Sequence, residues 1–361
     1  MKKIFFLTYG VNLENHADGL CKKVYAQVSA FEAKGYEVHL SGTMGDKYYI
    51  NGQIYNLRNK NIFEAQRDLI KLLCEFLKGK SYDLMYIRKF YFTANIIGFL
   101  RFIRGFFKHI VLELPTYPYY GELVTFRSKI GYWIEYLCVS KKLKNFIDNI
   151  VTFSEDEKIY NINCIKITNG ISENQIINKF NNYDDRLIFI SVSSITYWHG
   201  LDRFIKSMIQ YSDLNIQLHI FGPDNSLCKD LRQLCNDGGI SDKVIFHGYK
   251  SGIYLDQVYS QSTIGLGSLG RHRSKIYNLN SLKNREYIAK GLPVVYSEND
   301  NEIDSEVFVY KVSADESIVN LEEIFEWYKD NKFNKKDISK KAYDFVWEKQ
   351  IEKILVNLGL M

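Results

Sequence analysis

The chain has 361 residues, of which 46% are hydrophobic and 25% charged, and its formal net charge is +5. This length suits two domains rather than one, and the composition excludes a disordered or fibrous protein. No apolar run reaches the roughly 18 residues that a membrane span needs. The amino-terminal apolar run stops at Asn12-Leu13-Glu14 without a small-residue cleavage site, so we interpret it as a first β-strand and not as a signal peptide.

Short apolar runs alternate with helical periodicity along the first half of the chain. The predicted strands are 4–9, 37–42, 83–88, 110–114, 149–154 and 164–168. The predicted helices are 19–34, 62–79, 93–106 and 126–145. Strands that alternate with helices are typical of a parallel sheet covered on both faces.

The second half repeats this alternation. Its predicted strands are 186–192, 216–222, 243–248, 262–267 and 292–297. Its predicted helices are 200–211, 225–237, 253–260, 281–290, 316–330 and 336–358. The sequence therefore predicts an α/β protein with two Rossmann-like, doubly wound parallel-sheet domains that face a cleft.

The polar, Asn-rich span from Asn169-Gly170 to Asp185 marks the expected join between the domains. We predict an N-terminal domain at 1–170 and a C-terminal domain at 171–345. The last segment, 346–361, carries Trp347 among apolar positions, and we expect it to pack back on the N-terminal domain.

The six cysteines form no CxxC pair and mostly lie in apolar periodic segments. This pattern favours reduced, buried thiols in a cytoplasmic protein and argues against a zinc site. Four acids, Glu298, Asp300, Glu302 and Asp304, follow a predicted strand. They could hold a divalent ion, but a solvated loop is the favoured interpretation.

Positive charge is concentrated in residues 86–146, which contain 10 basic and 3 acidic side chains interleaved with aromatic residues. Such a segment suits an anionic membrane surface. The alternative is a solvated helix face whose aromatic residues contact the core. Nucleic-acid binding is disfavoured because no recognised motif accompanies the charge.

The loops after the second-half strands carry the polar residues expected of a ligand site. Ser193 and Ser194 follow one strand and precede a helix, whose amino end accepts phosphate. An ordinary capped turn is the alternative. Gly248 allows close backbone approach, which suits a flat base resting on Tyr249.

A long glycine-rich, then basic loop spans 265–283 and leads into a helix that carries Lys283 and Glu286. A loop this long in a compact domain is usually functional. Its cations, Arg271, His272, Arg273 and Lys275, suit phosphates, and a carboxylate suits ribose hydroxyls. These features together predict a nucleotide-diphosphate site, and the absence of GxxxxGK[ST] and GxGxxG argues against a P-loop or a dinucleotide fold.

The stretch SLKNREYIAKGLPVV (281–295) resembles the donor-site motif of GT-B glycosyltransferases, specifically the retaining glycosyltransferase family 4, also called group 1. Three further stretches carry the resemblance across nearly the whole chain: KVIFHGYK, ITNGI (167–171) and the amino-terminal YGVNLENHADGLCKKVYAQVSAFEAKGYEVHL. The stretches YWHGLDRF and ELPTYPYYGEL are similar to members that assemble polysaccharides.

The sequence departs from the family pattern at three positions. The family has a second glutamate eight positions before the ribose-binding one, where this chain has Asn278. The family's diphosphate-binding Arg and Lys correspond to Ser194 and His199. Arg271, Arg273 and Lys283 are the expected replacements.

The resemblance implies a retaining hexosyltransferase that moves a sugar from a nucleotide-diphosphate sugar, expected to be a UDP-sugar, to a hydroxyl of a glycan or polyprenyl-linked acceptor in cell-surface polysaccharide assembly. No metal or other cofactor is expected, and the expected location is the cytoplasm, peripherally at the inner face of a bacterial cell membrane. The alternatives are a non-catalytic GT-B scaffold subunit of another transferase and a GT-B sugar-nucleotide epimerase or hydrolase.

The site residues that follow from this interpretation fall into three groups. The catalytic group is Asn278, facing the transferred sugar, Glu286, holding the ribose, and Lys283 and Arg271, stabilising the diphosphate. The donor-binding group is Gly19, Ser193, Ser194, His199, Gly248, Tyr249, Arg273, Ser281 and Leu282. The acceptor-side candidates are His16, Arg88 and Glu113 in the N-terminal domain.

Overall fold

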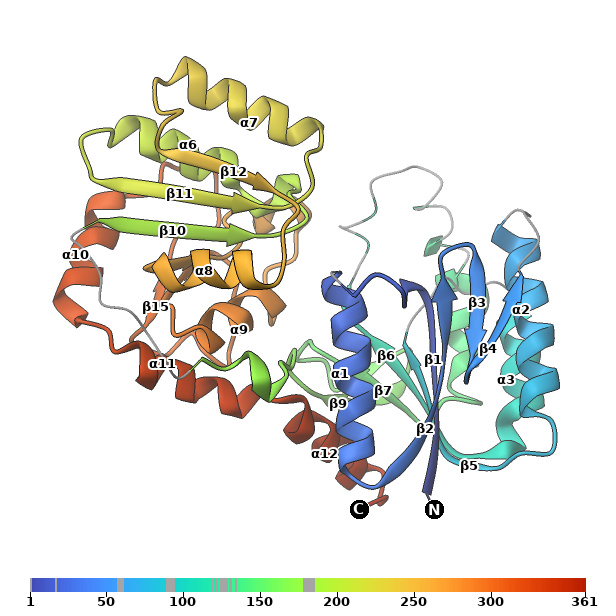
Figure 1. Cartoon of the computed structure of the whole chain (residues 1–361). Helices are drawn as coiled ribbons and strands as arrows, with labels where there is room; N and C mark the ends of the chain where they lie inside the picture. The colour runs from blue at the N-terminus through green and yellow to red at the C-terminus, as the bar shows by residue number, and fades with distance from the viewer. Residues whose placement is uncertain are drawn as a thin grey trace. The chain divides into compact units, whose positions relative to one another are not determined.

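The computed structural model describes residues 2–16, 18–56, 62–88, 95–118, 120, 123, 129, 132–133, 135–177 and 186–361. The chain divides into two compact units (Figure 1). The N-terminal unit comprises Met1–Thr168 and Trp347–Met361, and the C-terminal unit comprises Asn169–Val346. Part of the predicted linker and part of the basic segment 86–146 lie outside the described residues.

The N-terminal unit is built on a sheet with the strand order β4-β3-β2-β1-β5-β6-β7-β9-β8. The neighbouring strands β2, β1, β5, β6, β7 and β9 pair in parallel, whereas β3 and β4 at one side of the sheet and β8 at the other pair antiparallel. The strands are β1 (Lys2–Asn12), β2 (Tyr36–Met44), β3 (Lys47–Ile50), β4 (Gln53–Asn56), β5 (Tyr82–Arg88), β6 (Phe107–Leu114), β7 (Asn149–Thr152), β8 (Lys158–Ile159) and β9 (Ile162–Lys166).

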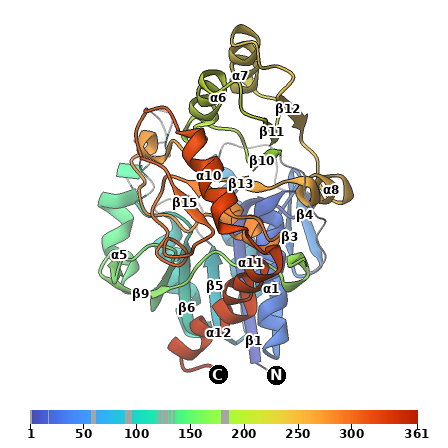
Figure 2. The same ribbon diagram turned by 90° about the vertical axis from the view of Figure 1, so that its left-hand side faces the viewer.

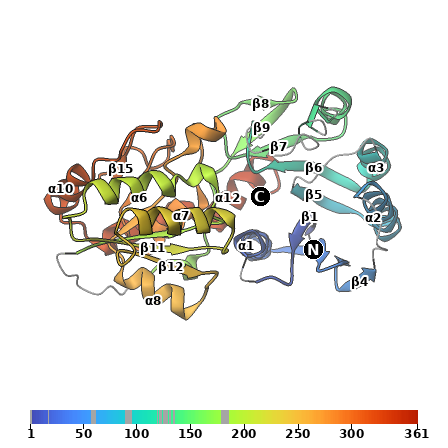
Figure 3. The same ribbon diagram turned by 90° about the horizontal axis from the view of Figure 1, so that it is seen from above.

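Helices cover both faces of this sheet, which explains the continuous apolar run in β1. Ile4 and Phe6 pack in the core cluster of α1 (Gly19–Ala33) and α12 (Trp347–Asn357). Phe5 and Leu7 point the other way and pack with α2 (Ile62–Leu77) and α3 (Asn95–Ile103), which lie side by side in Figure 3. Because alternate strand residues face opposite sides, a central parallel strand is apolar throughout.

The C-terminal unit contains a six-stranded sheet in the order β12-β11-β10-β13-β14-β15, with every pair parallel. The carboxyl ends of its strands therefore meet at one edge, where ligands bind in folds of this kind. The strands are β10 (Leu187–Val192), β11 (Ile216–Phe221), β12 (Val244–Gly248), β13 (Ile264–Leu266), β14 (Val294–Tyr296) and β15 (Val309–Lys311).

Two core clusters lie on the two faces of this second sheet. One contains residues of α6, α7 and α10, and Figure 2 shows α6 beside α7. The other contains residues of α8, α9 and α11. These helices are α6 (Leu201–Gln210), α7 (Ser226–Asp237), α8 (Ile253–Gln261), α9 (Leu282–Ala289), α10 (Leu321–Asn331) and α11 (Lys335–Lys341).

The structure differs from the predicted elements in three places. The predicted helix 336–358 is interrupted, because Val346 is extended (φ −62°, ψ 143°) between the 3-10 turn η7 (Ala342–Phe345) and α12. The hairpin β3–β4 and the short strands β8 and β15 were not predicted. Much of the predicted helix 126–145 lies outside the described residues, and its described end forms η3 (Glu135–Ser140), a π-helix, and α5 (Lys141–Leu143).

Three further observations concern the described residues alone. Cys21, Cys74, Cys164, Cys228 and Cys235 are free thiols. No helix among these residues combines the length and apolar character required to cross a membrane. No group of three His, Cys, Asp or Glu side chains there is arranged to hold a metal ion.

Candidate functional site

The loops at the carboxyl ends of β10, β13 and β14 bring four ionisable side chains together: His199, Arg271, Lys283 and Glu298. The charges of Lys283 and Arg271 act on both His199 and Glu298. His199 is 7% exposed and Glu298 is 1% exposed. A polar cluster buried at this edge of a parallel sheet is the candidate ligand site of the C-terminal unit.

Helix α9 presents Lys283 and is anchored to the sheet by side chains on its inner face. The Tyr287 hydroxyl accepts from the backbone N–H of Val192 at 2.9 Å and donates to the Leu266 carbonyl at 3.2 Å, which ties the helix to β10 and β13. Arg285 forms two hydrogen bonds of 2.7 and 2.8 Å to Asp300, and neither side chain is exposed. The amino end of α9 is therefore held rigidly against the loops.

The Lys283 ammonium is the most distinctive group of the site. Its Nζ is buried and has no hydrogen-bond partner among the described residues. Burial lowers the pKa of Lys283 to about 7, although the Glu298 carboxylate opposes this effect, and the Arg271 charge lowers the pKa further. A buried cation without a partner is costly unless an anion binds it, so this position favours an anionic ligand.

Glu298 is the site residue that the sequence interpretation missed. The prediction of a solvated acidic loop is wrong for Glu298 and Asp300, since both are buried. Glu298 Oε1 accepts from Asn284 Nδ2 at 3.4 Å, while Oε2 has no hydrogen-bond partner among the described residues. Burial raises the pKa of Glu298, against the opposing charges of Lys283 and Arg271. Nothing local in the sequence indicates this burial.

His199 is neutral, and its tautomer follows from its contacts. The backbone N–H of Thr196 donates to Nδ1 at 3.0 Å, so the ring proton lies on Nε2. Burial, followed by the charges of Lys283 and Arg271, holds the pKa of His199 well below its usual value. A neutral imidazole can donate one hydrogen bond, but it does not replace the cation that the family pattern has at this position.

The loop after β10 is tightly constrained. Ser193 Oγ accepts from the Ile195 N–H at 3.2 Å, which leaves the Ser193 hydroxyl proton available to a ligand. Ile195 has φ 50°, an unusual value for a β-branched residue, and it is buried. Gly222 directly follows the neighbouring strand β11. A Cβ there would lie 2.2 Å from the Ser193 carbonyl oxygen, so this position requires glycine. Ser194 is exposed. Strain of this kind is typical of binding loops.

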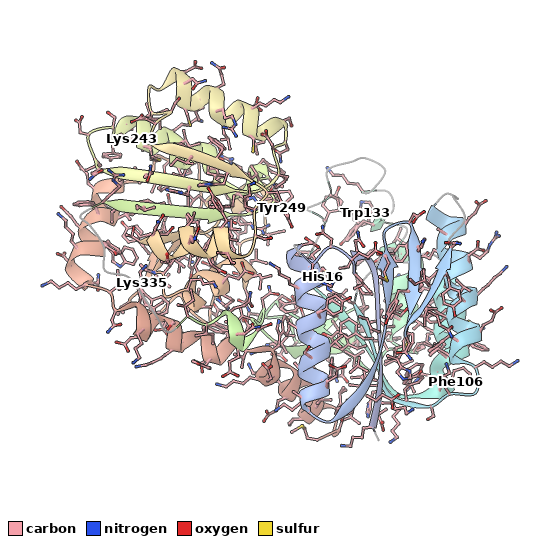
Figure 4. The ribbon with its side chains drawn as sticks, in the orientation of Figure 1. His16, Phe106, Trp133, Lys243, Tyr249 and Lys335 are labelled. Carbon is pink, nitrogen blue, oxygen red and sulfur yellow. The ribbon has the colours of Figure 1, made fainter. Side chains whose placement is uncertain are left out.

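Gly248 ends β12, and Tyr249 follows with 54% of its surface exposed. Figure 4 shows Tyr249 near the arrowheads of the sheet. His247, two positions before Tyr249, is held by hydrogen bonds between its Nε2 and His219 Nδ1 at 2.9 Å and between its Nδ1 and the Tyr254 hydroxyl at 2.9 Å. Tyr249 is thus an exposed aromatic residue directly after the carboxyl end of β12.

The two loop arginines have different environments. Arg271 lies with its guanidinium 5.7 Å from the Trp198 ring and its charge acts on Lys283. All five N–H groups of Arg273 are used within the unit: Nε by Glu316, Nη1 by the Tyr197 carbonyl and Asp202, and Nη2 by Asp202 and Glu316. Arg273 is therefore fully engaged within the C-terminal unit, which disfavours its predicted contact with a ligand phosphate.

The remaining predicted donor residues lie on or next to α9. Glu286 is half-buried on the helix, Ser281 is its buried N-cap and Leu282 its first residue. Asn278 is exposed, and its amide oxygen accepts from Asn299 Nδ2 at 3.1 Å. Lys283 and Glu286, three positions apart, fall on neighbouring turns of one short helix.

In the N-terminal unit, Glu113 and Arg88 belong to a buried network at the carboxyl ends of β5 and β6. Glu113 Oε1 lies 3.3 Å from both Lys23 Nζ and Arg88 Nε. Its Oε2 accepts from Gln27 Nε2 at 2.7 Å and from the Tyr86 hydroxyl at 2.6 Å. Glu113 has no exposed surface. This carboxylate is engaged within the core, which favours a structural role over direct acceptor binding.

His16 and Gly19 lie at the amino end of α1, and both are exposed. The His16 ring centroid is 5.3 Å from that of Tyr25, and Figure 4 shows His16 above the start of the helix. A Cβ at Gly19 would meet no atom within 4 Å. These two residues are exposed at the start of the helix whose Lys23 contacts Glu113, whereas Arg88 and Glu113 are buried.

Known proteins resemble this chain in sequence over part of its length. Residues 172–307 match the model of the family described as glycosyl transferases group 1. An uncharacterized glycosyltransferase of Methanocaldococcus jannaschii is 26% identical over 192 residues, which cover 49% of this chain and 48% of that protein. In that match, this chain covers about half the length of the curated relative.

Solved structures share the fold over the whole chain. A sucrose-phosphate synthase of Thermosynechococcus elongatus has a TM-score of 0.72 at 15% identity and covers 99% of both chains. A glycosyltransferase of Rickettsia africae has a TM-score of 0.71 at 13% identity, covering 99% of this chain and 97% of the other. HepE of Anabaena, solved with UDP and glucose, has a TM-score of 0.67 at 13% identity over 100% of both chains. The fold is that of GT-B glycosyltransferases, and the family match supports a role in glycosyl transfer.

Proposed function

We propose that this protein is a retaining glycosyltransferase of the family 4 type that moves a sugar from a UDP-sugar to a hydroxyl of a glycan or lipid-linked acceptor. The observation that carries the proposal is the buried Lys283 ammonium, which lacks a hydrogen-bond partner among the described residues and stands beside Arg271 at the sheet edge. Both residues lie within the stretch that matches the group 1 family model. The UDP bound by HepE, a protein of the same fold, supports this choice of ligand.

In this mechanism the protein positions the substrates and stabilises the leaving diphosphate. Lys283, Arg271 and the Ser193 hydroxyl bind the phosphates, and Glu286 accepts hydrogen bonds from the ribose. As the bond between the sugar and the diphosphate breaks, the acceptor oxygen attacks the same face of the sugar. Its proton passes to a phosphate oxygen of the leaving UDP. Positioning and charge stabilisation of this kind need no protein nucleophile.

Calorimetry tests the donor site directly. Wild-type protein is titrated with UDP, GDP and ADP, and Lys283→Met is titrated with the nucleotide that binds. Loss of a charge-assisted contact should weaken binding by about tenfold to a hundredfold. Lys229→Met, which removes an exposed lysine from α7, is the matched control and should bind normally. Absence of nucleotide binding to the wild-type protein would contradict the proposal.

Glu286→Gln tests the ribose contact. The substitution keeps the shape of the side chain but removes the charge, so the fold should be preserved while transfer falls at least tenfold. The measurement is sugar transfer from the nucleotide sugar that gives the largest thermal shift in a screen. Full activity in this variant would remove Glu286 from the site.

A non-catalytic scaffold is the second candidate, because Asn278, Ser194 and His199 stand where the family pattern has an acid and two cations. A scaffold would not bind a nucleotide diphosphate, so the same calorimetry separates it from the transferase. A sugar-nucleotide epimerase or hydrolase would bind the nucleotide. It is recognised by product formation in the absence of an acceptor.

We propose that cations of this chain, and not a metal ion, balance the charge of the diphosphate. Lys283 and Arg271 supply two positive charges at the position where the diphosphate is expected. Transfer activity should therefore be unchanged in EDTA. An activity that falls in EDTA and returns with a divalent ion would contradict this part of the proposal.

Peripheral association with an anionic membrane is proposed for the basic–aromatic segment 86–146. In its described part, Trp133 is 50% exposed and Leu137 is 59% exposed, and Lys141 and Lys142 follow as exposed cations. Figure 4 labels Trp133 in this region. Apolar side chains rimmed by cations suit a lipid surface. Liposomes with anionic lipids should retain the protein at low salt but not at high salt, and neutral liposomes should not retain it.

A further inference from the structure

The loop that leads into α9 runs beside the segment that follows β14. Asn278 in this loop forms a parallel bridge with Asn299. The Asn299 N–H donates to the Tyr277 carbonyl at 2.6 Å, and the Leu279 N–H donates to the Asn299 carbonyl at 2.9 Å. These bonds fix Asn278, which is exposed, near the carboxyl end of β14, the edge of the sheet at which ligands bind in folds of this kind.

A hydrogen-bond chain of three side chains sets the orientation of the Asn278 amide. The Lys311 ammonium, on the last residue of β15, donates to Asn299 Oδ1 at 3.3 Å. Asn299 Nδ2 in turn donates to Asn278 Oδ1 at 3.1 Å. Because a lysine can only donate, the Asn299 atom that faces it is the oxygen. Asn299 therefore turns its NH2 group to Asn278, and the Asn278 atom that meets this group is also an oxygen.

The Lys311 ammonium gives this chain a fixed starting point. An ammonium group has three N–H donors. Besides Asn299, the Lys311 ammonium donates to the main-chain carbonyl of Glu298 and to Asp304 Oδ2. Turning the Asn299 amide round would place an NH2 group against the cation and leave donors facing each other, so the observed orientation is the favoured one.

The Asn278 Nδ2 is left as a donor without a hydrogen-bond partner among the described residues. Since the chain begins at a cation, each amide along it is polarised, and its last N–H group becomes a stronger donor. An anionic oxygen is the best partner of such a donor, because a hydrogen bond to a charged group is about twice as strong as a neutral one. A sugar hydroxyl accepts the same bond more weakly.

We propose that Asn278 selects a nucleotide sugar whose sugar carries a carboxylate, and that Asn299 is the positioning residue that turns the Asn278 NH2 group to it. The inference rests on the proposed function, in which the diphosphate contacts Lys283, five positions after Asn278. Five residues of chain span at most about 17 Å, so one extended ligand reaches both side chains. The substrate class is a UDP-uronate.

Calorimetry with matched sugars tests the carboxylate. Wild-type protein is titrated with UDP, UDP-N-acetylglucosamine and two matched pairs: UDP-glucuronate with UDP-glucose, and UDP-galacturonate with UDP-galactose. The neutral member of each pair has a CH2OH group in place of the carboxylate. In at least one pair the uronate should bind about tenfold more tightly than its neutral counterpart. Equal or weaker binding of both uronates, or tighter binding of UDP-N-acetylglucosamine than of either uronate, would overturn the proposal.

Three substitutions of asparagine by aspartate separate recognition from a general effect of charge. Asn278→Asp keeps the oxygen that meets Asn299 but presents a second oxygen to the ligand. Asn299→Asp removes the NH2 group that orients Asn278, whose amide should then turn round and present its own oxygen. Both variants should lower the preference for the uronate by about tenfold or more. Asn301→Asp, which adds the same charge at an exposed position of the same loop, should keep the preference.

The affinity of each UDP-sugar is compared with that of UDP in the same protein, so that a general loss of affinity or stability cancels. A merely structural role of Asn299 would weaken the two members of a pair equally in Asn299→Asp, and this result would overturn its positioning role. If UDP does not bind to the wild-type protein, the proposed function fails, and the assignment of the sugar fails with it. If UDP binds but the uronates gain nothing over the neutral sugars, only the assignment of the carboxylate fails.

Discussion

Glu113 illustrates how single residues of the N-terminal unit depend on their neighbours. Burial opposes ionisation of this side chain, but the cations of Lys23 and Arg88 and the hydrogen bonds from Tyr86 and Gln27 outweigh burial. Together these groups lower the pKa of Glu113 to about 2. The ionised carboxylate is therefore a stabilising part of the folded core.

This shift predicts acid sensitivity of the N-terminal unit. Because the folded pKa lies below the unfolded one, the ionised Glu113 contributes about 3 kcal/mol above pH 5, and this contribution is lost as pH falls from about 4.5 towards 2. Glu113→Gln should lower the free energy of unfolding at pH 7 by an amount of this order and flatten its pH dependence in that window. Urea unfolding at several pH values measures the free energy of unfolding of both proteins. If Glu113→Gln loses stability between pH 4.5 and 2 as steeply as the wild type, the prediction is contradicted.

The Arg285–Asp300 pair predicts a larger effect in the C-terminal unit. Both side chains are fully buried, so Asp300→Ala leaves an uncompensated guanidinium and should cost about 3–5 kcal/mol of unfolding free energy. The double variant Arg285→Met, Asp300→Ala removes both charges and should recover part of that loss. Equal stability of the single and double variants would indicate that charge burial is not the cause.

At the residue scale, the sequence could indicate Lys283 and Glu286, because they belong to a local helix-turn-strand motif. It could not indicate Glu298, because an acid in a polar loop has the same local pattern whether it is solvated or buried. The engagement of all Arg273 donors by Asp202, Glu316 and Tyr197 likewise depends on segments far apart in the chain. Burial and pairing of charges are tertiary properties.

At the scale of elements, the contact of α9 with β13 depends on a glycine. A Cβ at Gly265 would lie 2.4 Å from two ring atoms of Tyr287, the residue whose hydroxyl ties α9 to β10 and β13. The absence of a side chain at this position lets the helix approach the strand closely enough to make those bonds.

Gly265→Ala should therefore displace α9, lower the unfolding free energy of the C-terminal unit by about 1–3 kcal/mol and weaken nucleotide binding. Gly98→Ala is the control, because a Cβ there meets nothing within 4 Å in helix α3. Alanine at that position should be neutral or stabilising by up to about 1 kcal/mol. Chemical unfolding and calorimetry measure both variants, and normal nucleotide binding by Gly265→Ala would contradict the packing argument.

Most strands and helices could be located from their periodicity, whereas the missed elements are short or lie at edges. The β3–β4 hairpin has its turn at Asn51-Gly52, where φ is 44° and 89°, and an Asn-Gly pair between β-prone runs is a recognisable signal. Strand β15 spans only Val309–Lys311 and has no periodicity to detect. The interruption at Val346 follows no helix breaker, and it falls where the chain passes from one unit to the other.

At the scale of the whole molecule, the end of the chain completes the first unit. Trp347, Ile351 and Ile354 are buried in the same core cluster as α1, and Figure 2 shows α12 next to α1. The Lys23 ammonium lies 5.4 Å from the Trp347 ring. The N-terminal unit is thus built from two segments separated by the entire C-terminal unit.

Trp347→Ala should lower the stability of the N-terminal unit by about 3–5 kcal/mol, because it leaves a large cavity between α12 and α1. Hydrogen exchange should increase in α1 and remain unchanged in α9. Trp133→Ala, which removes a 50% exposed side chain, should change stability by less than about 0.5 kcal/mol. Equal loss of protection in α1 and α9 would show that the two units unfold together.

The sequence by itself determined the alternation of strands and helices, the presence of two parallel sheets and the local motif that carries Lys283 and Glu286. These are encoded by periodicity and by residues close together in the chain. Only the tertiary structure decided that Glu298 and Asp300 are buried, that Glu113 is a core residue and that Lys283 lacks a partner among the described residues. The physical reason is that solvation and charge pairing depend on what the folded chain places around a side chain, and local sequence does not record those neighbours.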